Sequence, residues 1–337
     1  MGATGELRVG MIGCGGNARG HMARLLRIEG VKIVALADPS ESAIAATIEK
    51  FPELADVPKF DDYRKMLEQV EMDAVEISTP HVFHYDQIMD SLRSGKHVLC
   101  EKPMVCTTLQ AIDVVKEVRA TGLTMGIAYQ RHFMGPYRYC RQKILSGEVG
   151  AVNYISAVQS QNWYRGQVPR GTWRSKKALS CGGQLNDSGS HLLDIVLWMT
   201  GLEPEQVFAF ENNLDAEVDI LTAMSVRFSG GGLCTIGVVG HSVNWFEEIA
   251  IWCEDATFVI RDSSRVIEWK GSEQATVLEP DQLPGFGDPD LNFVAAIRGE
   301  QEIQAPPECG LQVIRLTEAA WKSAETGQPV AVPPVTV

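Results

Sequence analysis

Short apolar runs alternate with amphipathic stretches from Leu7 to Ala128. The runs are apolar on both faces, which is typical of strands that are covered on both sides in a parallel sheet. In the stretches between them, apolar residues recur at helical spacing. Strands that alternate with helices in this way predict a doubly wound parallel sheet with helices on both faces. The predicted strands are Leu7–Ile12, Val31–Ala37, Asp73–Ser78, Lys96–Cys100 and Leu123–Ala128.

After Tyr129 the pattern changes to mostly period-two segments with a few helices. The predicted strands are Ala151–Gln161, Asp219–Phe228, Leu233–His241, Glu248–Cys253, Thr257–Arg261 and Arg265–Trp269. The predicted helices are Gly135–Ser146, Asp187–Met199, Leu291–Arg298 and Leu311–Ser323. A chain of 337 residues suits two domains of about 150 residues each. We therefore predict a first domain over residues 1–128 and a second, α+β domain over residues 129–337 with a large open, mostly antiparallel sheet.

The chain carries 30 lysines and arginines against 43 aspartates and glutamates, a formal net charge of −13. This acidity, without a basic run, argues against binding of nucleic acid or of an anionic membrane. No apolar stretch approaches the ~20 residues that span a bilayer, and Met1–Leu7 lacks the features of a secretory signal. Eight cysteines without a C-x-x-C pair indicate free thiols in a reducing compartment. We therefore expect a soluble, cytoplasmic protein.

A glycine-rich turn at residues 13–18, with the sequence GCGGNA, follows the first predicted strand and opens the first predicted helix. Glycine allows the tight turn and the close approach of the backbone to a pyrophosphate, which the helix N-terminus then binds. A G-x-G-x-x-A motif in this context predicts a dinucleotide-binding, Rossmann-type domain. The alternative interpretation is a tight strand–helix turn without a ligand. The predicted contacts in this turn are Gly13, Gly15, Asn17 and Ala18.

Asp38 ends the second predicted strand, 20 residues after Ala18. An acidic residue at this place hydrogen-bonds the adenosine ribose of a dinucleotide. A carboxylate there repels a 2′-phosphate, so the sequence favours NAD over NADP. The alternative is an ordinary turn aspartate before proline.

Thr79 and Pro80 follow the strand Asp73–Ser78 and are predicted to line the cofactor, and His84 is assigned to the same site. His81 and His84 are spaced as i and i+3, which is compatible with metal binding. No third ligand accompanies them nearby in the sequence, so we predict no metal site.

Two further features suggest acid–base chemistry. Lys102 follows the apolar run His97–Cys100, and the carboxyl ends of such strands are where nucleotide-binding sheets hold their ligands. Asp187 and His191 are four residues apart, so on a helix they share a face, and a histidine titrates near neutral pH. Taken alone, the lysine is an ordinary loop residue and the pair an ordinary exposed helical pair. Their co-occurrence with the dinucleotide turn supports a catalytic role.

These residues together resemble the glucose–fructose oxidoreductase / inositol dehydrogenase (Gfo/Idh/MocA) family. The resemblance rests on residues 13–18, on Ser78-Thr79-Pro80, on the stretch GKHVLCEKP at residues 95–103, and on Asp187 with His191. It implies an N-terminal Rossmann domain and a C-terminal α/β domain whose open sheet forms the oligomer interface. It thus implies a homodimer or homotetramer.

The resemblance also implies roles for individual residues. Lys102 matches the lysine that contacts the reacting hydroxyl near the nicotinamide, and Glu101 matches a residue near the nicotinamide ribose. Asp187 and His191 match the substrate-binding acid and the acid/base histidine. Our hypothesis is that His191 takes the proton of a secondary alcohol while a hydride passes to NAD, and that Lys102 stabilises the developing alkoxide.

Aromatic, amide and guanidinium groups accumulate between Gln159 and Arg174, a mixture that suits a sugar or cyclitol ring. We assign Arg131, Trp163, Trp173 and Arg174 to substrate binding, together with Lys102, Asp187 and His191. Packing of the tryptophans as core is the alternative. The arginines allow an anionic sugar but do not require one. The lead hypothesis is an NAD-dependent sugar or polyol dehydrogenase; a redox-neutral sugar-modifying enzyme with tightly held NAD and a non-catalytic NAD/sugar-sensing regulator stay open.

Overall fold

The computed structural model describes residues 5–271, 274–283 and 285–334, and the chain forms two compact units over these ranges. The first unit contains the chain up to Ala128 together with Gly287–Gly310. The second contains Tyr129–Phe286 and residues 311–334. Gly287–Gly310, which the sequence pattern assigns to the second domain, thus belongs to the first unit. Residues 1–4 of the N-terminal segment considered above lie outside the described residues.

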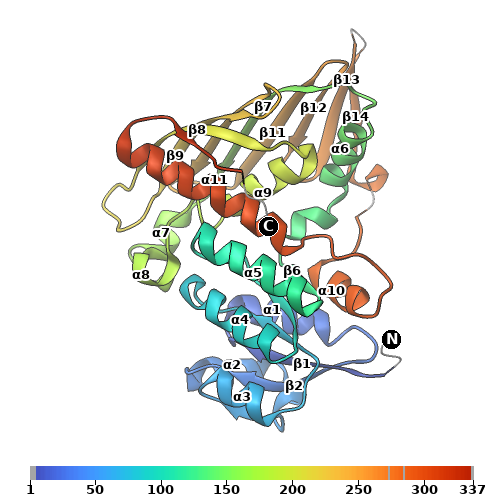
Figure 1. The fold of residues 1–337 in the computed structure, drawn as a ribbon, viewed down its shortest axis with the longest axis vertical. Coiled ribbons are helices and arrows are strands. Elements are labelled where there is room, and N and C mark those ends of the chain that lie inside the picture. Colours follow the sequence, from blue (N-terminus) through green and yellow to red (C-terminus); the bar gives the residue numbers. More distant parts are fainter. Residues whose placement is uncertain (1–4, 272–273, 284, 335–337) are drawn as a thin grey trace. The chain divides into compact units, whose positions relative to one another are not determined.

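The first unit is built on a parallel sheet whose strand order, within the described ranges, is β3-β2-β1-β4-β5-β6 (Figure 1). This is the order of doubly wound dinucleotide-binding sheets, so the predicted Rossmann fold is confirmed. All five predicted strands are present, and the short β3 was not predicted. The strands are β1 (Leu7–Ile12), β2 (Val31–Ala37), β3 (Lys59–Phe60), β4 (Ala74–Ile77), β5 (His97–Cys100) and β6 (Met125–Ile127).

Helices cover the sheet of the first unit. α1 (Gly16–Leu25) packs against α10 (Pro289–Ile297), and α10 in turn contacts β5 and β6. α4 (His84–Arg93) packs on β4 and β5 and contacts α3 (Tyr63–Gln69) and α5 (Thr108–Thr121). α2 (Glu41–Lys50) follows β2. The late segment of the chain therefore supplies, as α10, the cover for two strands of the first sheet.

The second unit is built on a large sheet whose order, over the described residues, is β14-β13-β12-β11-β7-β10-β9-β8-β15 (Figure 1). β7 and β10 run parallel and the other described pairs are antiparallel, so the prediction of a mostly antiparallel sheet is confirmed. Buried and exposed residues alternate along β7 and β9, so one face of the sheet packs on a core. The strands are β7 (Val152–Ser160), β8 (Pro204–Asn212), β9 (Leu221–Phe228), β10 (Leu233–Val239), β11 (Phe246–Cys253), β12 (Ala256–Arg261), β13 (Arg265–Lys270), β14 (Thr276–Leu278) and β15 (Val330–Ala331).

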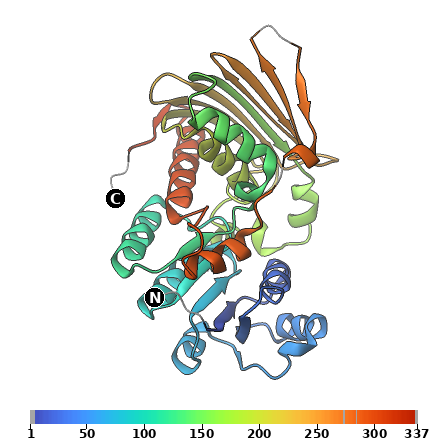
Figure 2. The same ribbon diagram turned by 90° about the vertical axis from the view of Figure 1, so that its right-hand side faces the viewer.

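Helices of the second unit lie against that buried face (Figure 2). α9 (Gly189–Thr200) packs against α6 (Gly135–Leu145) and β7, and α11 (Pro307–Thr326) is tied to β8 by the bond from the Ala209 N–H to Ser323 Oγ, 3.0 Å. Two short helices, α7 (Trp163–Gln167) and α8 (Lys177–Ser180), precede α9. α9 starts at Gly189, so the expectation that Asp187 and His191 lie on one helix is wrong. Asp187 lies in the preceding turn, where its N–H donates to the Gly183 carbonyl.

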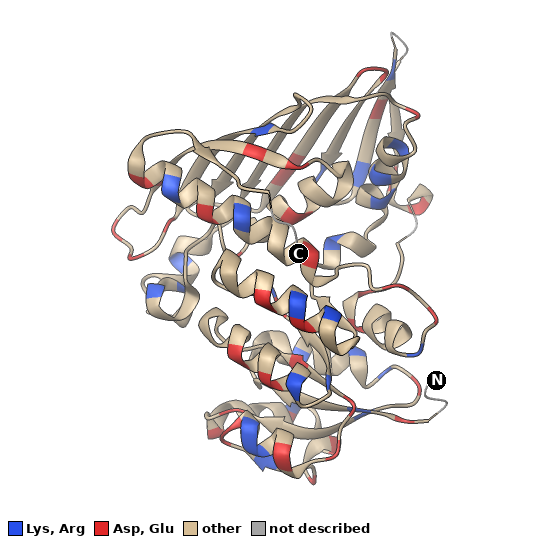
Figure 3. Cartoon of the chain, viewed as in Figure 1, with Lys and Arg blue, Asp and Glu red and all other residues tan. Residues whose placement is uncertain are grey.

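Charge, cysteines and helix length add three facts. Acidic and basic residues are distributed over the helices and strands of each unit (Figure 3). Within the described ranges, no helix combines the length and apolarity needed to cross a membrane. Cys106 and Cys181 are disulfide-bonded, so the prediction of free thiols throughout is wrong for these two. The free cysteines are Cys14, Cys100, Cys140, Cys234, Cys253 and Cys309.

Candidate active site

The glycine turn joins the ends of three strands in the first unit. The Gly13 N–H donates to the Ala37 carbonyl at the end of β2, 2.8 Å away. Gly13 has φ +102°, and a Cβ at this position would lie 2.3 Å from the Ser78 carbonyl oxygen after β4. Only glycine fits both the backbone conformation and the contact. A Cβ at Gly15, by contrast, would meet nothing within 4 Å, so the backbone there is open to a ligand.

Asp38 fixes the same turn from the side of β2. One oxygen of its carboxylate accepts the N–H of Cys14 at 2.8 Å, and the other accepts the N–H of Ser40 at 2.8 Å. Each carboxylate oxygen has a second lone pair and can still accept a hydroxyl. In the turn itself Ala18 is buried and Asn17 is exposed at the start of α1. These residues fit a dinucleotide whose pyrophosphate lies at the N-terminus of α1.

The loop after β4 is held by hydrogen bonds of its own. The Thr79 hydroxyl donates to Gln87 on α4 at 2.6 Å, and Pro80 follows it in extended backbone. The two ring nitrogens of the buried His84 lie 3.0 Å from the Thr79 carbonyl oxygen and 2.9 Å from the Pro103 carbonyl oxygen. Burial lowers the pKa of His84. His84 therefore connects the loop after β4 to the loop after β5. Both loops lie at the carboxyl ends of the strands, where sheets of this kind bind their ligands.

Glu101 and Lys102 follow β5. One oxygen of Glu101 accepts the Lys102 N–H at 3.1 Å, and the other lies 3.3 Å from Nε2 of His21 on α1. Lys102 is almost fully buried, and its bond to Pro103 is cis. Nδ1 of His21 lies 2.7 Å from Asp290 on α10, which also accepts from Arg24. A buried charged cluster thus stands behind the Glu101–Lys102 turn.

In the second unit, three other predicted substrate residues are brought together around Asp187. The Trp163 indole N–H donates to the Asp187 carboxylate at 2.7 Å, and Nε of Arg174 lies 3.3 Å from the same oxygen. The Arg174 guanidinium in turn stacks over the Trp173 ring, with 4.3 Å to its centroid. Asp187 is therefore a buried carboxylate with its orientation fixed by an indole and a guanidinium.

His191, one turn further along, lines a pocket of about 370 Å³ in the second unit. Its ring lies edge-on to the Tyr129 ring, with centroids 5.8 Å apart. The pocket volume falls within the range of small-molecule sites, about 300–1,000 Å³. The other lining residues are Gln130, Arg131, Met134, Gln159, Ser188, Trp245 and Ser263.

Arg131 is held in this pocket by residues that sequence reasoning missed. Its Nη2 lies 2.5 Å from a carboxylate oxygen of Glu247, and both side chains are buried. Glu247 is paired in register with Gln159 across β11 and β7. Both occupy inward positions of strands whose other inward residues are apolar. A polar residue at an inward position of a strand is the sequence signal that could have identified Gln159 and Glu247 as site residues.

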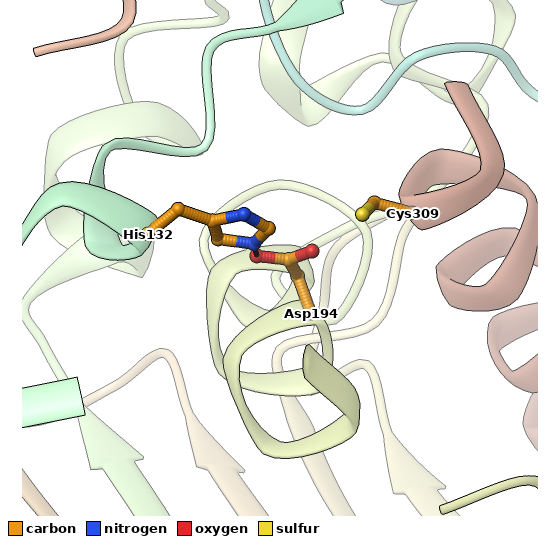
Figure 4. A group of neighbouring side chains, drawn as sticks. All are labelled: His132, Asp194 and Cys309. Carbon is orange, nitrogen blue, oxygen red and sulfur yellow. Dashed lines mark hydrogen bonds and ion pairs between the residues drawn. The ribbon is translucent and has the colours of Figure 1, made fainter. Parts of the chain in front are cut away.

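A second buried histidine–carboxylate pair involves Asp194 in the middle of α9. His132 Nε2 is 2.8 Å from an Asp194 oxygen (Figure 4). The His132 ring stacks on Trp198, with centroids 4.3 Å apart, and burial raises the pKa of Asp194. Cys309, also drawn in Figure 4, belongs to the first unit.

Two family models match the chain. The model of the oxidoreductase family with the NAD-binding Rossmann fold covers residues 7–129, and that of the GFO/IDH/MocA C-terminal domain covers residues 137–259. An uncharacterized oxidoreductase of Bacillus subtilis (strain 168), YrbE, is 24% identical over 347 residues, which span 98% of this chain and 97% of that protein. D-glucoside 3-dehydrogenase of Escherichia coli (strain K12) is 30% identical over 199 residues, 59% of this chain and 55% of that protein.

Among solved structures, the WlbA dehydrogenase from Bordetella pertussis, in complex with NADH and UDP-GlcNAcA, superposes with a TM-score of 0.85. It is 23% identical, and the match covers 98% of this chain and 100% of that one. This similarity shows the fold, while the two family models show descent. The chain therefore belongs to the Gfo/Idh/MocA family of NAD-binding oxidoreductases.

Proposed function

We propose that this protein is a dehydrogenase that moves a hydride between a hydroxyl-bearing carbon of a sugar, polyol or cyclitol and NAD. The observation that carries the proposal is the place of His191 on the wall of a pocket that is lined by amide, hydroxyl and guanidinium residues together with Met134 and Trp245, in a chain whose first unit has a dinucleotide turn. Aromatic faces with hydrogen-bonding groups suit sugar rings. Relatives that are named as dehydrogenases or reductases of sugars and inositol support the same class.

We assign the cofactor to the edge of the first sheet. Gly13, Gly15, Asn17 and Ala18 would hold the pyrophosphate at α1, and Asp38 would hold the adenosine ribose. Thr79, Pro80 and Glu101 would border the nicotinamide half, with His84 fixing the loops that carry them. When bound, NAD supplies the hydride acceptor. Because a 2′-phosphate beside the Asp38 carboxylate would be repelled, we propose NAD in preference to NADP.

The chemistry on the substrate side is assigned to three residues. Neutral His191 takes the proton of the hydroxyl as general base. The Lys102 ammonium stabilises the negative charge that develops on that oxygen. Asp187, fixed by Trp163 and Arg174, orients the hydroxyl. In the reverse direction His191 returns the proton to the alkoxide.

We further propose that the protein is a cytoplasmic homodimer or homotetramer assembled through the large sheet of the second unit. Phe210, Leu233 and Trp252 are exposed on the face of that sheet opposite the helices. Exposed apolar side chains on one sheet face are a feature of subunit interfaces. The six free cysteines support a reducing compartment, whereas the disulfide-bonded Cys106 and Cys181 do not.

The test is a panel of neutral sugars, inositols, uronates and nucleotide sugars, each supplied with NAD and with NADP, with nicotinamide absorbance as the readout. The proposal expects steady accumulation of NADH with at least one member and a lower KM for NAD than for NADP. Conversion of a sugar without net NADH would establish the redox-neutral alternative. Binding of NAD without turnover of any member would favour the regulator. A lower KM for NADP would overturn the cofactor assignment.

A further inference from the structure

The pocket beside His191 contains one arginine, and that arginine is already paired. Arg131 is 5% exposed and its partner Glu247 is 1% exposed. The opposite oxygen of Glu247 accepts the Tyr137 hydroxyl at 2.6 Å and the Ser263 hydroxyl at 3.1 Å. The carboxylate is therefore fully engaged and its position is fixed. Because both side chains are buried, the positive charge of Arg131 is compensated by the Glu247 carboxylate and not by solvent.

One donor of Arg131 stays available to a ligand. Nη1 is buried and has no hydrogen-bond partner among the described residues. Nη2 is occupied by Glu247 and, with the Gln159 amide turned to satisfy its own neighbours, by the Gln159 oxygen at 3.0 Å. A buried donor without a partner destabilises the folded protein, and a hydrogen bond to a ligand oxygen would remove this destabilisation. Arg131 cannot offer the two-nitrogen fork that usually binds a carboxylate, because one nitrogen is taken.

The second arginine of this unit's site is neutralised in the same way. Arg174 lies against the buried carboxylate of Asp187. Other residues that line the pocket carry no formal charge while His191 is neutral, and its role as a base requires that form. A carboxylate bound in the pocket would lose its hydration and meet no uncompensated positive charge among the residues that line it. An uncharged hydroxyl or ring oxygen would lose much less hydration free energy on entering the pocket.

We propose that the Arg131–Glu247 pair makes this pocket selective for an uncharged oxygen of the substrate, so that neutral sugars or polyols are preferred over their uronates. Nη1 donates to a hydroxyl or ring oxygen, and Trp245, which is 47% exposed, offers an apolar face to the ring. Glu247 is thus a specificity-determining residue that acts through Arg131. The inference rests on the proposed function, since it places a sugar beside His191.

The experiment compares matched pairs, glucose with glucuronate and galactose with galacturonate, by kcat/KM with NAD and by calorimetric binding in the presence of NADH. The wild-type protein should prefer the neutral member by about tenfold or more. Glu247→Gln leaves the Arg131 charge uncompensated and should shift the ratio toward the uronate by about tenfold or more. Glu248→Gln, which removes the neighbouring carboxylate on the other face of β11, where it pairs with Arg261, should leave the ratio unchanged.

The outcomes separate this inference from the proposed function. A wild-type preference for the uronate, or an unchanged ratio in a folded Glu247→Gln variant, overturns the inference and leaves the dehydrogenase in place. If Glu247→Gln does not fold, the wild-type ratio of kcat/KM for the neutral sugar to that for the uronate tests the inference by itself. Absence of binding and of turnover for both members of each pair, and for the wider panel of sugars and polyols, overturns the proposed function and the inference together.

Discussion

Glu76 on β4 is a carboxyl group buried in the centre of the first unit. Its Oε1 accepts the Ser78 hydroxyl at 2.5 Å, and Nε2 of His21 lies 3.6 Å away. Burial raises the pKa of Glu76 to about 8, although the His21 imidazole opposes this rise. Burial by itself would lower the pKa of His21, but Glu76 and Asp290 raise it well above its usual range. Glu101 and Arg24 complete the charged groups that face this pair.

The signs of these shifts predict a pH-dependent stability. The folded state binds the Glu76 proton more tightly than the unfolded state between the ordinary pKa of 4.5 and about 8. The stabilisation is therefore present below 4.5 and is lost as the pH rises through this window. The raised pKa of His21 acts in the same direction, since its proton is also lost as the pH rises. Glu76→Gln, which cannot ionise, should gain stability relative to the wild type between about pH 5 and pH 9.

Urea unfolding at several pH values measures this difference. Glu68→Gln, an exposed glutamate on α3, is the control and should show no such trend. A constant difference between Glu76→Gln and the wild type across the range would contradict the assignment.

At the site, the sequence predicted which motif residues lie at the ends of strands. It did not predict which side chains pair with them. Gly13, Asp38 and Lys102 follow predicted strands, so their places at the strand ends follow from the pattern. The partner of Arg131 is Glu247, which is far away in sequence, and only the register of β11 on β7 brings Gln159 and Glu247 together. Local periodicity carries no information on which strands pair.

The turn between β1 and α1 is the element on which the cofactor assignment depends. Gly13→Ala forces a Cβ against the Ser78 carbonyl at a positive φ, so the turn must shift. We predict a loss of more than about 1 kcal/mol in the free energy of unfolding and a loss of NADH affinity. The measurements are denaturant unfolding and NADH fluorescence.

Gly16→Ala is the matched control for this turn. Gly16 starts α1, and a Cβ there would meet nothing within 4 Å. The substitution should change stability by less than about 1 kcal/mol. Equal losses in both variants would show that the turn does not depend on the geometry of Gly13.

Long apolar elements were predicted within a few residues, whereas short or interrupted ones were missed. β2 matches its predicted bounds, but β3 has two residues and gives no periodic signal. β8 starts Pro204-Glu205-Gln206, which hides the alternation that follows. α9 was placed two residues early, because the turn before it repeats the helical spacing.

On the scale of the whole chain, one sheet face of the second unit has no cover among the described residues. Trp252 is 40% exposed and lies across from Tyr154, with ring centroids 5.7 Å apart. Phe210 and Leu233 are exposed on the same face. A second copy of the chain is the occupant we propose for it.

Trp252→Glu places a charge on this face and should weaken the assembly. Light scattering after size exclusion should give at least twice the chain mass of 37.0 kDa for the wild type and the single-chain mass for the variant. Leu109→Glu, on an exposed residue of α5 in the first unit, should not change the mass. A wild-type mass of 37.0 kDa in solution would contradict the proposed interface.

The sequence pattern did not predict that Gly287–Gly310 belongs to the first unit. α10 has no local sequence feature that assigns it to the first unit, and its place depends on contacts such as Asp290 with His21, 269 positions apart. Such long-range pairing is decided by side-chain packing and burial of charge rather than by local spacing.

The central claim is that Lys102 acts on the substrate oxygen during hydride transfer to NAD, and one measurement tests it most directly. With the sugar or polyol that reacts fastest, kcat for NADH formation is compared between the wild type and Lys102→Ala, with Lys116→Ala on an exposed lysine of α5 as control. We predict that Lys102→Ala lowers kcat about a hundredfold or more while NADH affinity stays within about threefold. A Lys102→Ala variant with wild-type kcat would contradict the account.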